Sequence, residues 1–356
     1  MTQLLLGTRK GLVVLEGEPD AGFEVAHRAF PGESVEYAMR DPRTGRYLAA
    51  TTTWFYGPKL WVTDDPAGEW EQAPGVELPE GGDASLARMW VIEPGAADGV
   101  LYAGGDPGVL FESHDGGLSW ELNAGLWEHE TRPEWQPGGG GLCLHTIVPW
   151  PDDPARLMVA ISAVGVWLTE DAGKSWHYSN SGIVADYMPE EAKGAPIGYC
   201  VHNVRRSPAR PERLFMQFHG GVYRSDDAGG SWANVGLDSG LPSDFGFPIV
   251  VDPADPDSAY VIPLDGAGDR VTPGGAVRVF QTRDGGASWT SSSEGLPQEH
   301  AWLTVLREAF DTHGSGSGLE LYFGSTSGEV YGSGDAGTTW SRVAQSLPPV
   351  YSVRTA

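Results

Sequence analysis

Both cysteines of this 356-residue chain stand two residues before a histidine. Cys143 and His145 lie in "GLCLHTIVPWP", and Cys200 and His202 lie in "GYCVHNVRRSP". Because alternate residues of a β-strand project from one face about 6 to 7 Å apart, a thiolate and an imidazole at this spacing can bind one ion. Such ligands suit zinc, copper or iron. If the two pairs lie close together, the pattern predicts a transition-metal site.

The same four side chains have two other interpretations. Without a metal, an imidazole could activate Cys143 or Cys200 as a thiolate nucleophile. Each cysteine could also be a small buried residue, and each histidine a hydrogen-bonded wedge in a strand. A site closed by four protein ligands is structural, whereas catalysis needs an open position, so we expect an enzyme to use three of them at once.

A sequence repeat indicates which elements position these residues. Five segments, starting at residues 113, 169, 225, 282 and 333, share the template Ser/Thr-x-Asp-x-Gly-x-Ser/Thr-Trp, and a degenerate sixth copy starts at residue 63. The period of 50 to 57 residues equals one four-stranded propeller blade. Five equivalent aspartates cannot all be one active site. We therefore interpret the aspartate as an acceptor of turn N–H groups, the glycine as a positive-φ residue and the tryptophan as packing between sheets.

The segments around the repeats predict the fold. Two strand-like runs precede each repeat, and the N-terminal "LLLGTRKGLVVLE" has the same form without a repeat. The C-terminal "LPPVYSVRTA" is expected to supply the inner strand that this unit lacks. The prediction is an all-β chain with one domain over residues 1–356. It is a seven-bladed β-propeller whose ring is closed by pairing of the N- and C-terminal strands, which leaves no free sheet edge.

The repeats resemble the Asp-box, or BNR, repeats of sialidases, xyloglucanases and related propellers. The whole chain is similar to a bacterial family usually labelled BNR-repeat or sialidase-like, glycosyl hydrolase-like, through "TRPEWQPGGGGLCLHTIV", "LPSDFGFPIVV" and "LPQEHAWLTVL". This resemblance implies the propeller fold, with Asp-box turns, and raises glycoside hydrolysis as an activity. The Arg-Ile-Pro motif of sialidases is absent, and sialidases have six blades where seven are predicted here.

An alignment of the inner strands on the proline that follows them predicts which residues face the central channel. It places six residues at one level: Glu36, Arg88, His145, His202, Phe247 and Trp302. Two residues earlier come Ser34, Leu86, Cys143, Cys200, Phe245 and His300. The two Cys-x-His pairs thus occupy equivalent levels of adjacent blades. We expect Glu36 to move protons, Arg88 to hold an anionic group and His219 to be a further ligand or its hydrogen-bond partner.

Loops at one mouth of the channel carry the predicted substrate-binding residues. The loops that enter the first strand and those that join the second and third strands share this face, opposite the repeats. They bring together rings, cations and a carboxylate that suit a small polar or anionic ligand; the residues are His129, Arg132, Trp135, Asp244, Arg270, His300 and Trp302. For a glycosidase, the carboxylates to consider are Glu36, Asp106 and Asp244.

Charge and composition exclude several classes of function. A net charge of −25 argues against nucleic acid and against an anionic membrane as partners. "GGGG" at residues 138–141 precedes a strand and not a helix, so no nucleotide cofactor is expected. The N-terminus lacks the basic and apolar regions of a signal peptide, and no run approaches twenty apolar residues. We therefore expect a cytoplasmic protein with reduced thiols.

Three functions remain at this point. The sequence favours an enzyme with a Cys/His metal site at the channel mouth that acts on a small polar or anionic substrate by hydrolysis or oxidation. The first alternative is a sialidase-like glycoside hydrolase. The second is a non-catalytic propeller, similar to the Asp-box propellers that assist photosystem assembly, which binds a partner on the loop face.

Overall fold

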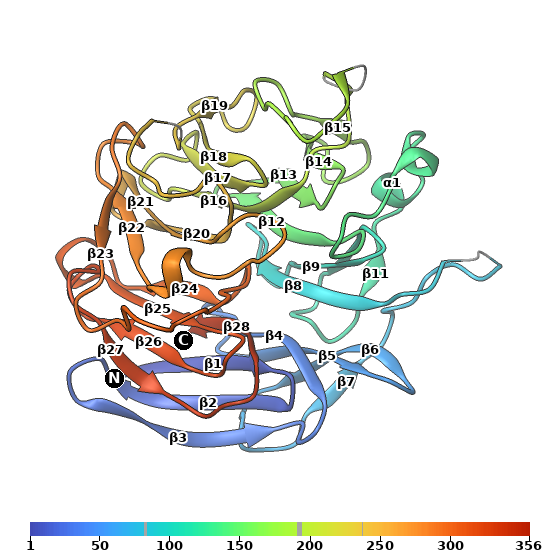
Figure 1. Cartoon of the computed structure of the whole chain (residues 1–356). Coiled ribbons are helices and arrows are strands. Elements are labelled where there is room, and N and C mark those ends of the chain that lie inside the picture. Colours follow the sequence, from blue (N-terminus) through green and yellow to red (C-terminus); the bar gives the residue numbers. More distant parts are fainter. Residues whose placement is uncertain (82–83, 191–193, 237) are drawn as a thin grey trace.

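The computed structural model describes residues 1–81, 84–190, 194–236 and 238–356. These residues form seven four-stranded antiparallel sheets around a central axis (Figure 1). The middle strands are buried on both faces because each sheet packs between two others; all five residues of "LFMQF" at 214–218 are buried, for example. The predicted seven-bladed β-propeller is confirmed.

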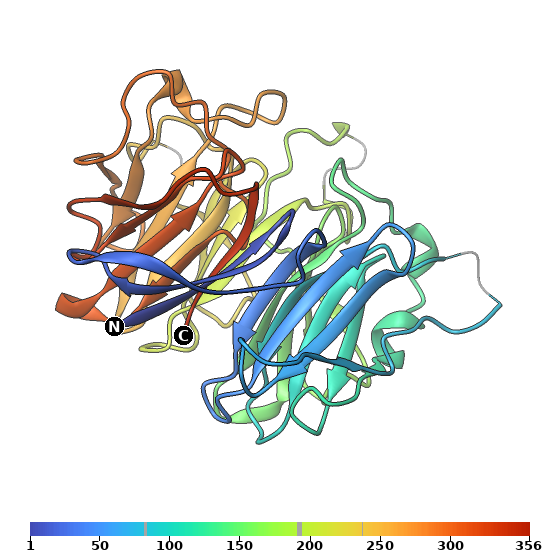
Figure 2. The same ribbon diagram turned by 90° about the horizontal axis from the view of Figure 1, so that it is seen from below.

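The first sheet joins the two ends of the chain. Its order is β28 (Val350–Thr355), β1 (Thr2–Thr8), β2 (Gly11–Glu18) and β3 (Gly22–Ala29). Leu6 of β1 lies opposite Val353 of β28, and the blue and red strands run side by side in both views (Figures 1 and 2). The C-terminal strand is innermost, so the predicted closure of the ring is confirmed.

The other six sheets follow in sequence order from the axis outward. Three come from the first half of the chain: β4 (Ser34–Arg40), β5 (Tyr47–Thr53), β6 (Gly57–Thr63) and β7 (Glu71–Ala73); β8 (Arg88–Pro94), β9 (Leu101–Asp106), β10 (Val109–Ser113) and β11 (Glu121–Leu122); β12 (Leu144–Trp150), β13 (Asp153–Ile161), β14 (Gly165–Thr169) and β15 (His177–Tyr178).

Three more come from the second half: β16 (Val201–Arg206), β17 (Leu214–Phe218), β18 (Gly221–Ser225) and β19 (Ala233–Asn234); β20 (Gly246–Asp252), β21 (Asp255–Pro263), β22 (Val279–Thr282) and β23 (Thr290–Ser292); β24 (Phe310–His313), β25 (Glu320–Gly324), β26 (Val330–Ser333) and β27 (Ser341–Ala344). The helical segments named in the described residues are α1 (Ala124–Trp127) and short 3-10 turns at Arg132–Glu134, Pro273–Gly275 and Gly316–Gly318. Within the described ranges, none of the helices has the length and apolar character needed to cross a bilayer.

The five full repeats form turns that are held by their aspartates. In each, one carboxylate oxygen accepts the N–H of the serine or threonine four residues later at 2.8 to 3.0 Å, and the other accepts that residue's hydroxyl at 2.6 to 2.8 Å; the aspartates are Asp115, Asp171, Asp227, Asp284 and Asp335. The tryptophan that follows is buried, and Trp232 donates to the carbonyl of Ser179 in the preceding blade. These aspartates therefore stabilise the turns of the fold. This agrees with the earlier argument that five equivalent aspartates cannot form one active site.

The inner strands carry β-bulges that set which residues reach the channel. The register shifts between Val35 and Tyr37 in β4, Leu144 and Thr146 in β12, and Val201 and Asn203 in β16, so Glu36, His145 and His202 are the bulged residues. They occupy equivalent positions, as the alignment predicted. A bulge leaves its extra residue unpaired and re-aims the side chain.

Two positions of that alignment are wrong. In β8 the shift falls between Met89 and Val91, so Trp90 takes the bulged position and Arg88 lies two residues earlier. The alignment assumed that the proline follows the inner strand, but Pro94 lies within β8 and is paired with Leu101. In the last sheet, the segment before β24 leaves Trp302 outside any strand and 56% exposed, while Glu308 is buried beside the channel.

Candidate metal-binding site at the channel mouth

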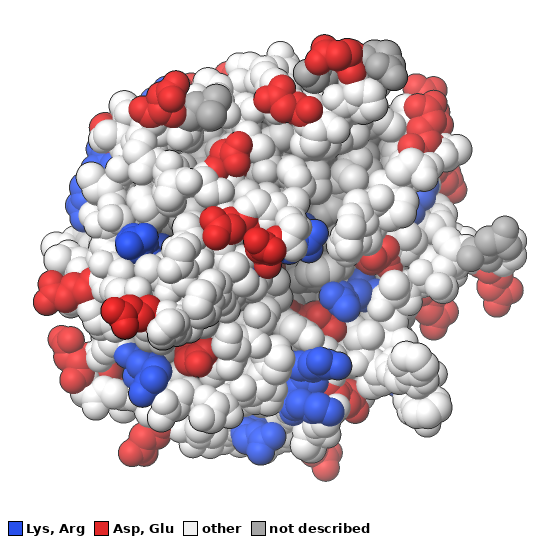
Figure 3. All heavy atoms as spheres, viewed as in Figure 1, with Lys and Arg blue, Asp and Glu red and all other residues white. Residues whose placement is uncertain are grey.

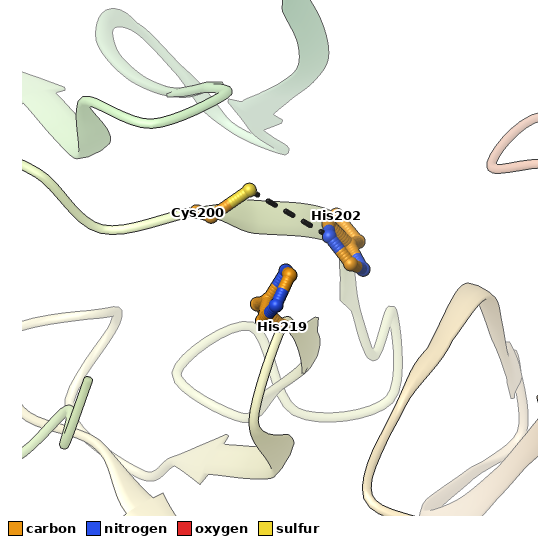
Figure 4. Close-up of side chains that lie close together, drawn as sticks. All are labelled: Cys200, His202 and His219. Atoms are coloured by element: carbon orange, nitrogen blue, oxygen red, sulfur yellow. Dashed lines mark hydrogen bonds between the residues drawn. The ribbon is translucent and has the colours of Figure 1, made fainter. Parts of the chain in front are cut away.

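Three of the five predicted metal ligands lie together: Cys200, His202 and His219, here called the three-ligand cluster (Figure 4). Their ligand atoms all lie within 4.8 Å of one another. Figure 4 shows the three side chains pointing toward a common space, two from the β16 segment and one from the end of β17. Among the described residues, this is the one group of three or more Cys, His, Asp or Glu side chains placed to hold a metal ion.

The pairing of β16 with β17 brings the cluster together. Cys200 directly precedes β16, and His219 directly follows β17. The backbone N–H of His219 donates to the carbonyl of Cys200 at 3.1 Å, which fixes the two residues opposite each other. The bulge at His202 breaks the simple alternation of β16 at the same point.

The hydrogen bond of His202 leaves one ring nitrogen available to a metal. Nδ1 lies 2.6 Å from the carbonyl oxygen of Gly246, which can only accept, so Nδ1 carries the proton. Nε2 therefore keeps its lone pair, 3.7 Å from the Sγ of Cys200. Metal-binding histidines commonly donate their other N–H to a carbonyl, because this fixes the tautomer and the ring orientation.

The electrostatic surroundings keep both imidazoles neutral. Burial lowers the pKa of His202 well below its ordinary value, and Arg307 lowers it further. Burial and Arg270 also lower the pKa of His219, although Asp244 opposes them. Burial raises the pKa of the Cys200 thiol. Neutral imidazoles are the form that binds metals.

The second Cys-x-His pair has different partners and lies outside the three-ligand cluster. The Sγ of Cys143 donates to the carbonyl of Gly140 at 3.0 Å, and burial, with the nearby Asp106 carboxylate, raises the pKa of this thiol to about 12. In His145, Nε2 donates to the carbonyl of Val201 at 2.9 Å and Nδ1 accepts from the hydroxyl of Thr146 at 2.9 Å. A centre formed by all four residues is therefore not what the geometry provides, because His145 spends both nitrogens on hydrogen bonds within the protein.

The two predicted catalytic residues face each other in a different part of the channel. Glu36 is buried, accepts from the hydroxyl of Ser34 at 2.8 Å and lies 3.7 Å from the Nε of Arg88. A cavity of about 110 Å³, here called the axial cavity, opens beside them; its lining residues are Glu36, Arg88, Trp90, Leu306, Arg307, Glu308 and Tyr351. None of the three metal-ligand candidates lines it.

Three residues that the sequence reasoning missed belong to this channel. They are Trp90, Arg307 and Glu308. Trp90 was missed because Pro94 lies inside β8, paired with Leu101, so that counting back six residues from it led to Arg88. Arg307 and Glu308 were hidden because residues 301–309 belong to no named strand in the structure. The one sequence signal for Arg307 and Glu308 was that these two charged residues, "RE", interrupt the mostly apolar segment that leads into the inner strand.

The predicted substrate-binding residues of the long connection 123–143, between β11 and β12, are held by contacts within the protein. The His129 ring contacts the hydroxyl of Thr131 and the carbonyl of Trp176. The Arg132 guanidinium donates to the carbonyls of Pro107 and Gly108 and lies 3.9 Å above the ring of Trp127. Trp135 is buried in the apolar core between two blades. The side chains of His129 and Arg132 are thus engaged in hydrogen bonds within the protein, and all three side chains help to hold the loop in place.

The remaining predicted substrate-binding residues lie on other loops of the mouth. Asp244 and Arg270 are close enough to His219 to shift its pKa in opposite directions. Trp302 covers Gly275, where an added Cβ would lie 3.1 Å from the indole, and the His300 ring lies 5.7 Å from that of Trp302. The face seen in Figure 3 is hollowed near the centre of the ring, and both basic and acidic side chains stand around the hollow.

Comparison with known proteins supports the fold and leaves the chemistry open. No family model matches the chain, and no curated protein is similar to it in sequence. Among solved structures, an ancestral GH74 enzyme superposes with a TM-score of 0.58 at 14% identity, over 88% of this chain and 39% of that one. YCF48 bound to a D1 peptide gives 0.54 at 15% identity, over 86% and 84% of the two chains. YCF48 from Cyanidioschyzon merolae gives 0.54 at 13% identity, over 87% and 84%.

This chain spans well under half of the GH74 enzyme. At these identities the likeness concerns the fold, because one fold carries many unrelated activities. The structure and the comparisons together establish a seven-bladed propeller, and within it the structure brings the ligand atoms of one thiol and two imidazoles within 4.8 Å of one another.

Proposed function

We propose that Cys200, His202 and His219 bind a transition-metal ion, zinc, copper or iron, and that the chain is a metal-dependent enzyme acting on a small polar or anionic substrate at this mouth. The observation that carries the proposal is the convergence of three ligand atoms within 4.8 Å of one another. Three protein ligands leave a coordination position for water or substrate, as catalytic sites require.

The protonation states support this assignment. Burial lowers the pKa of both imidazoles and so favours their neutral form, and the Nδ1–H of His202 is already held by the carbonyl of Gly246. The metal would supply the charge that a buried thiolate needs, because a bound cation stabilises a coordinating thiolate and displaces its proton.

Residues around the cluster suggest how a substrate would be received. A bound metal acts as a Lewis acid and lowers the pKa of a water ligand. Asp244 and Arg270 stand near His219 on two different loops. In this proposal Arg270 attracts the negative part of the substrate, and Asp244 serves as the general base.

The test begins with protein purified without a metal-affinity tag. Elemental analysis of the wild type and of Cys143→Ala should find roughly one zinc, copper or iron per chain, whereas His219→Ala should hold almost none. Screening with aryl esters, aryl phosphates and aryl glycosides, before and after chelation, then tests catalysis. A wild type that neither retains nor takes up a metal contradicts the proposal. Cleavage of an aryl glycoside by metal-free protein would favour the glycosidase alternative instead.

A further inference from the structure

The axial cavity holds a guanidinium whose hydrogen-bonding groups are only partly used. The Nε of Arg307 is buried and has no hydrogen-bond partner among the described residues. Its Nη2 reaches the hydroxyl of Ser162 at 3.4 Å, a long and weak contact. No ion pair within 4.0 Å is found for Arg307 among the residues that the structure describes.

The other charged groups of the channel are paired with one another. Glu308 accepts from Arg205 at 2.9 Å and also pairs with Arg354. Arg354 further contacts Asp311 at 3.5 Å. Glu36 lies against Arg88. The carboxylates that line the axial cavity are thus already engaged, and Arg307 contributes a positive charge that they do not match.

The aromatic surroundings of Arg307 make its unpaired guanidinium unfavourable in free energy. Its guanidinium lies 5.0 Å from the ring of Phe247 and 5.8 Å from that of Trp90. Arg307 is half-buried, and such contacts offset only part of the free energy lost where its guanidinium is removed from water. A buried N–H without a partner adds a further cost, since the desolvation of that group is not compensated. The positive charge and the unpaired N–H of Arg307 together indicate that an anion binds beside this guanidinium.

From these observations we propose that the axial cavity binds a small oxyanion, a carboxylate or a phosphate, held by the guanidinium of Arg307, which lines it. A guanidinium presents pairs of parallel N–H groups, which match two oxygens of such an anion. The cavity of about 110 Å³ has room for a group the size of a few water molecules. Arg88 lines the same cavity, and the N–H groups that it does not turn toward Glu36 offer a second donor.

This site is separate from the proposed metal centre and does not depend on it. None of the three metal-ligand candidates lines the cavity, and Arg307 affects Cys200 and His202 through its charge. The experiment therefore uses chelator-treated, metal-free protein. A failure of the metal proposal leaves the anion site unaffected, and the reverse also holds.

The test compares sodium acetate and sodium phosphate with sodium chloride at constant ionic strength, by thermal unfolding and by titration calorimetry. In the wild type, one of the two oxyanions should raise Tm saturably above the chloride reference. Acetate alone would identify a carboxylate site, and phosphate alone a phosphate site. Arg307→Lys keeps the charge but loses the paired N–H groups, so the affinity should fall by about tenfold or more.

Two variants complete the design. Arg307→Gln should fold, as checked by circular dichroism, and should lose the response. Arg156→Gln is the matched control, because Arg156 is an arginine stacked on Trp150 at 3.7 Å and lies outside the axial cavity; it should respond as the wild type does. A wild type that shows no saturable response to either oxyanion, or a response that Arg307→Gln retains in full, overturns the proposal.

Discussion

The β12–β15 and β16–β19 sheets carry the same Cys-x-His pattern at the same bulge of the inner strand, yet the two pairs end in different surroundings. Each histidine donates to a carbonyl of the next blade, His145 to Val201 and His202 to Gly246. They do so with different nitrogens. His145 donates through Nε2 and fills Nδ1 with the hydroxyl of Thr146, whereas His202 donates through Nδ1 and turns Nε2 toward its cysteine.

A third position separates the two blades further. Ser162 donates its N–H to the carbonyl of Cys143, and His219 donates its N–H to the carbonyl of Cys200, so the two residues are structurally equivalent. One blade has a hydroxyl where the other has an imidazole. The comparison shows that the Cys-x-His pattern alone does not make a metal-binding site. The hydrogen bonds of each imidazole, and the residue opposite the cysteine, decide whether the ligand atoms of a blade face one point.

The largest expected effect is on metal affinity, when the residue opposite the cysteine, His219 in one blade and Ser162 in the other, is replaced by alanine. His219→Ala removes a ligand and should weaken metal binding by at least about 100-fold, more than the loss of a hydrogen-bond partner to a ligand costs. Ser162→Ala should leave the metal affinity unchanged. Competition titration with a chromophoric chelator measures both. Equal losses in the two variants would break the distinction between the blades.

The structural role of His145 predicts a loss of stability and not of metal. His145→Ala leaves the carbonyl of Val201 and the hydroxyl of Thr146 without their partner in a fully buried place, so the free energy of unfolding should fall by about 2 kcal/mol. Urea unfolding measures this change, and metal content should stay at the wild-type level. His114→Ala, at an exposed position, is the control and should change stability little. Loss of metal in His145→Ala would contradict the assignment.

Thiol modification offers a smaller effect that compares the two cysteines directly. Cys143 is 1% exposed and its thiol is engaged with the carbonyl of Gly140, whereas Cys200 is half-buried. Cys200 should therefore react with iodoacetamide about tenfold faster than Cys143 in metal-free protein, and bound metal should protect it. Mass spectrometry of the Cys143→Ala and Cys200→Ala variants assigns each rate. Faster reaction at Cys143 would show that the two environments are assigned the wrong way round.

The repeat turns of the same two blades, which contain Asp171 and Asp227, should respond to pH in the same way. Hydrogen bonds from Ser175 hold the pKa of Asp171 at about 2, below the usual 3.8. In Asp227, burial opposes the hydrogen bonds from Ser231, and the pKa is lowered overall. A carboxyl group with a lowered pKa contributes stability above its ordinary pKa, and this contribution is lost as the pH falls toward the folded-state value.

Asp171→Asn and Asp227→Asn should therefore both give a slightly flatter dependence of Tm on pH between about 4 and 2. Thermal unfolding over this range measures the slope. The effect is small because both carboxylates are largely exposed to solvent. A flattening in only one variant would show that the two turns differ as well.

Much of the fold could be predicted from the sequence because its signals are local and repeated. Five turn templates at a near-constant period fix the blade length, and an unpaired N-terminal hairpin with a C-terminal strand-like segment indicates how the ring closes. The errors in the inner strands arose at Pro94 and before β24. Pro94 lies inside β8, and residues 301–309 form no named strand before β24, so the alignment placed the wrong residue in both sheets.

The site was only partly predictable for a related reason. Cys200, His202 and His219 were recognised from residue type and strand position, and the bulge of β16 agreed with the expected level. The exclusion of Cys143 and His145 depends on which nitrogen donates to which carbonyl, and this is a tertiary property. Arg307 could not be singled out, since its significance lies in the partner that it lacks.

The most direct measurement is a cobalt(II) titration of metal-free protein, followed through the thiolate-to-metal charge-transfer absorption. The wild type and Cys143→Ala should develop this band with about one equivalent of cobalt, because the thiolate of Cys200 binds the ion. Cys200→Ala should show no such band. A band that is lost in Cys143→Ala and kept in Cys200→Ala, or that is absent from the wild type, would contradict the account.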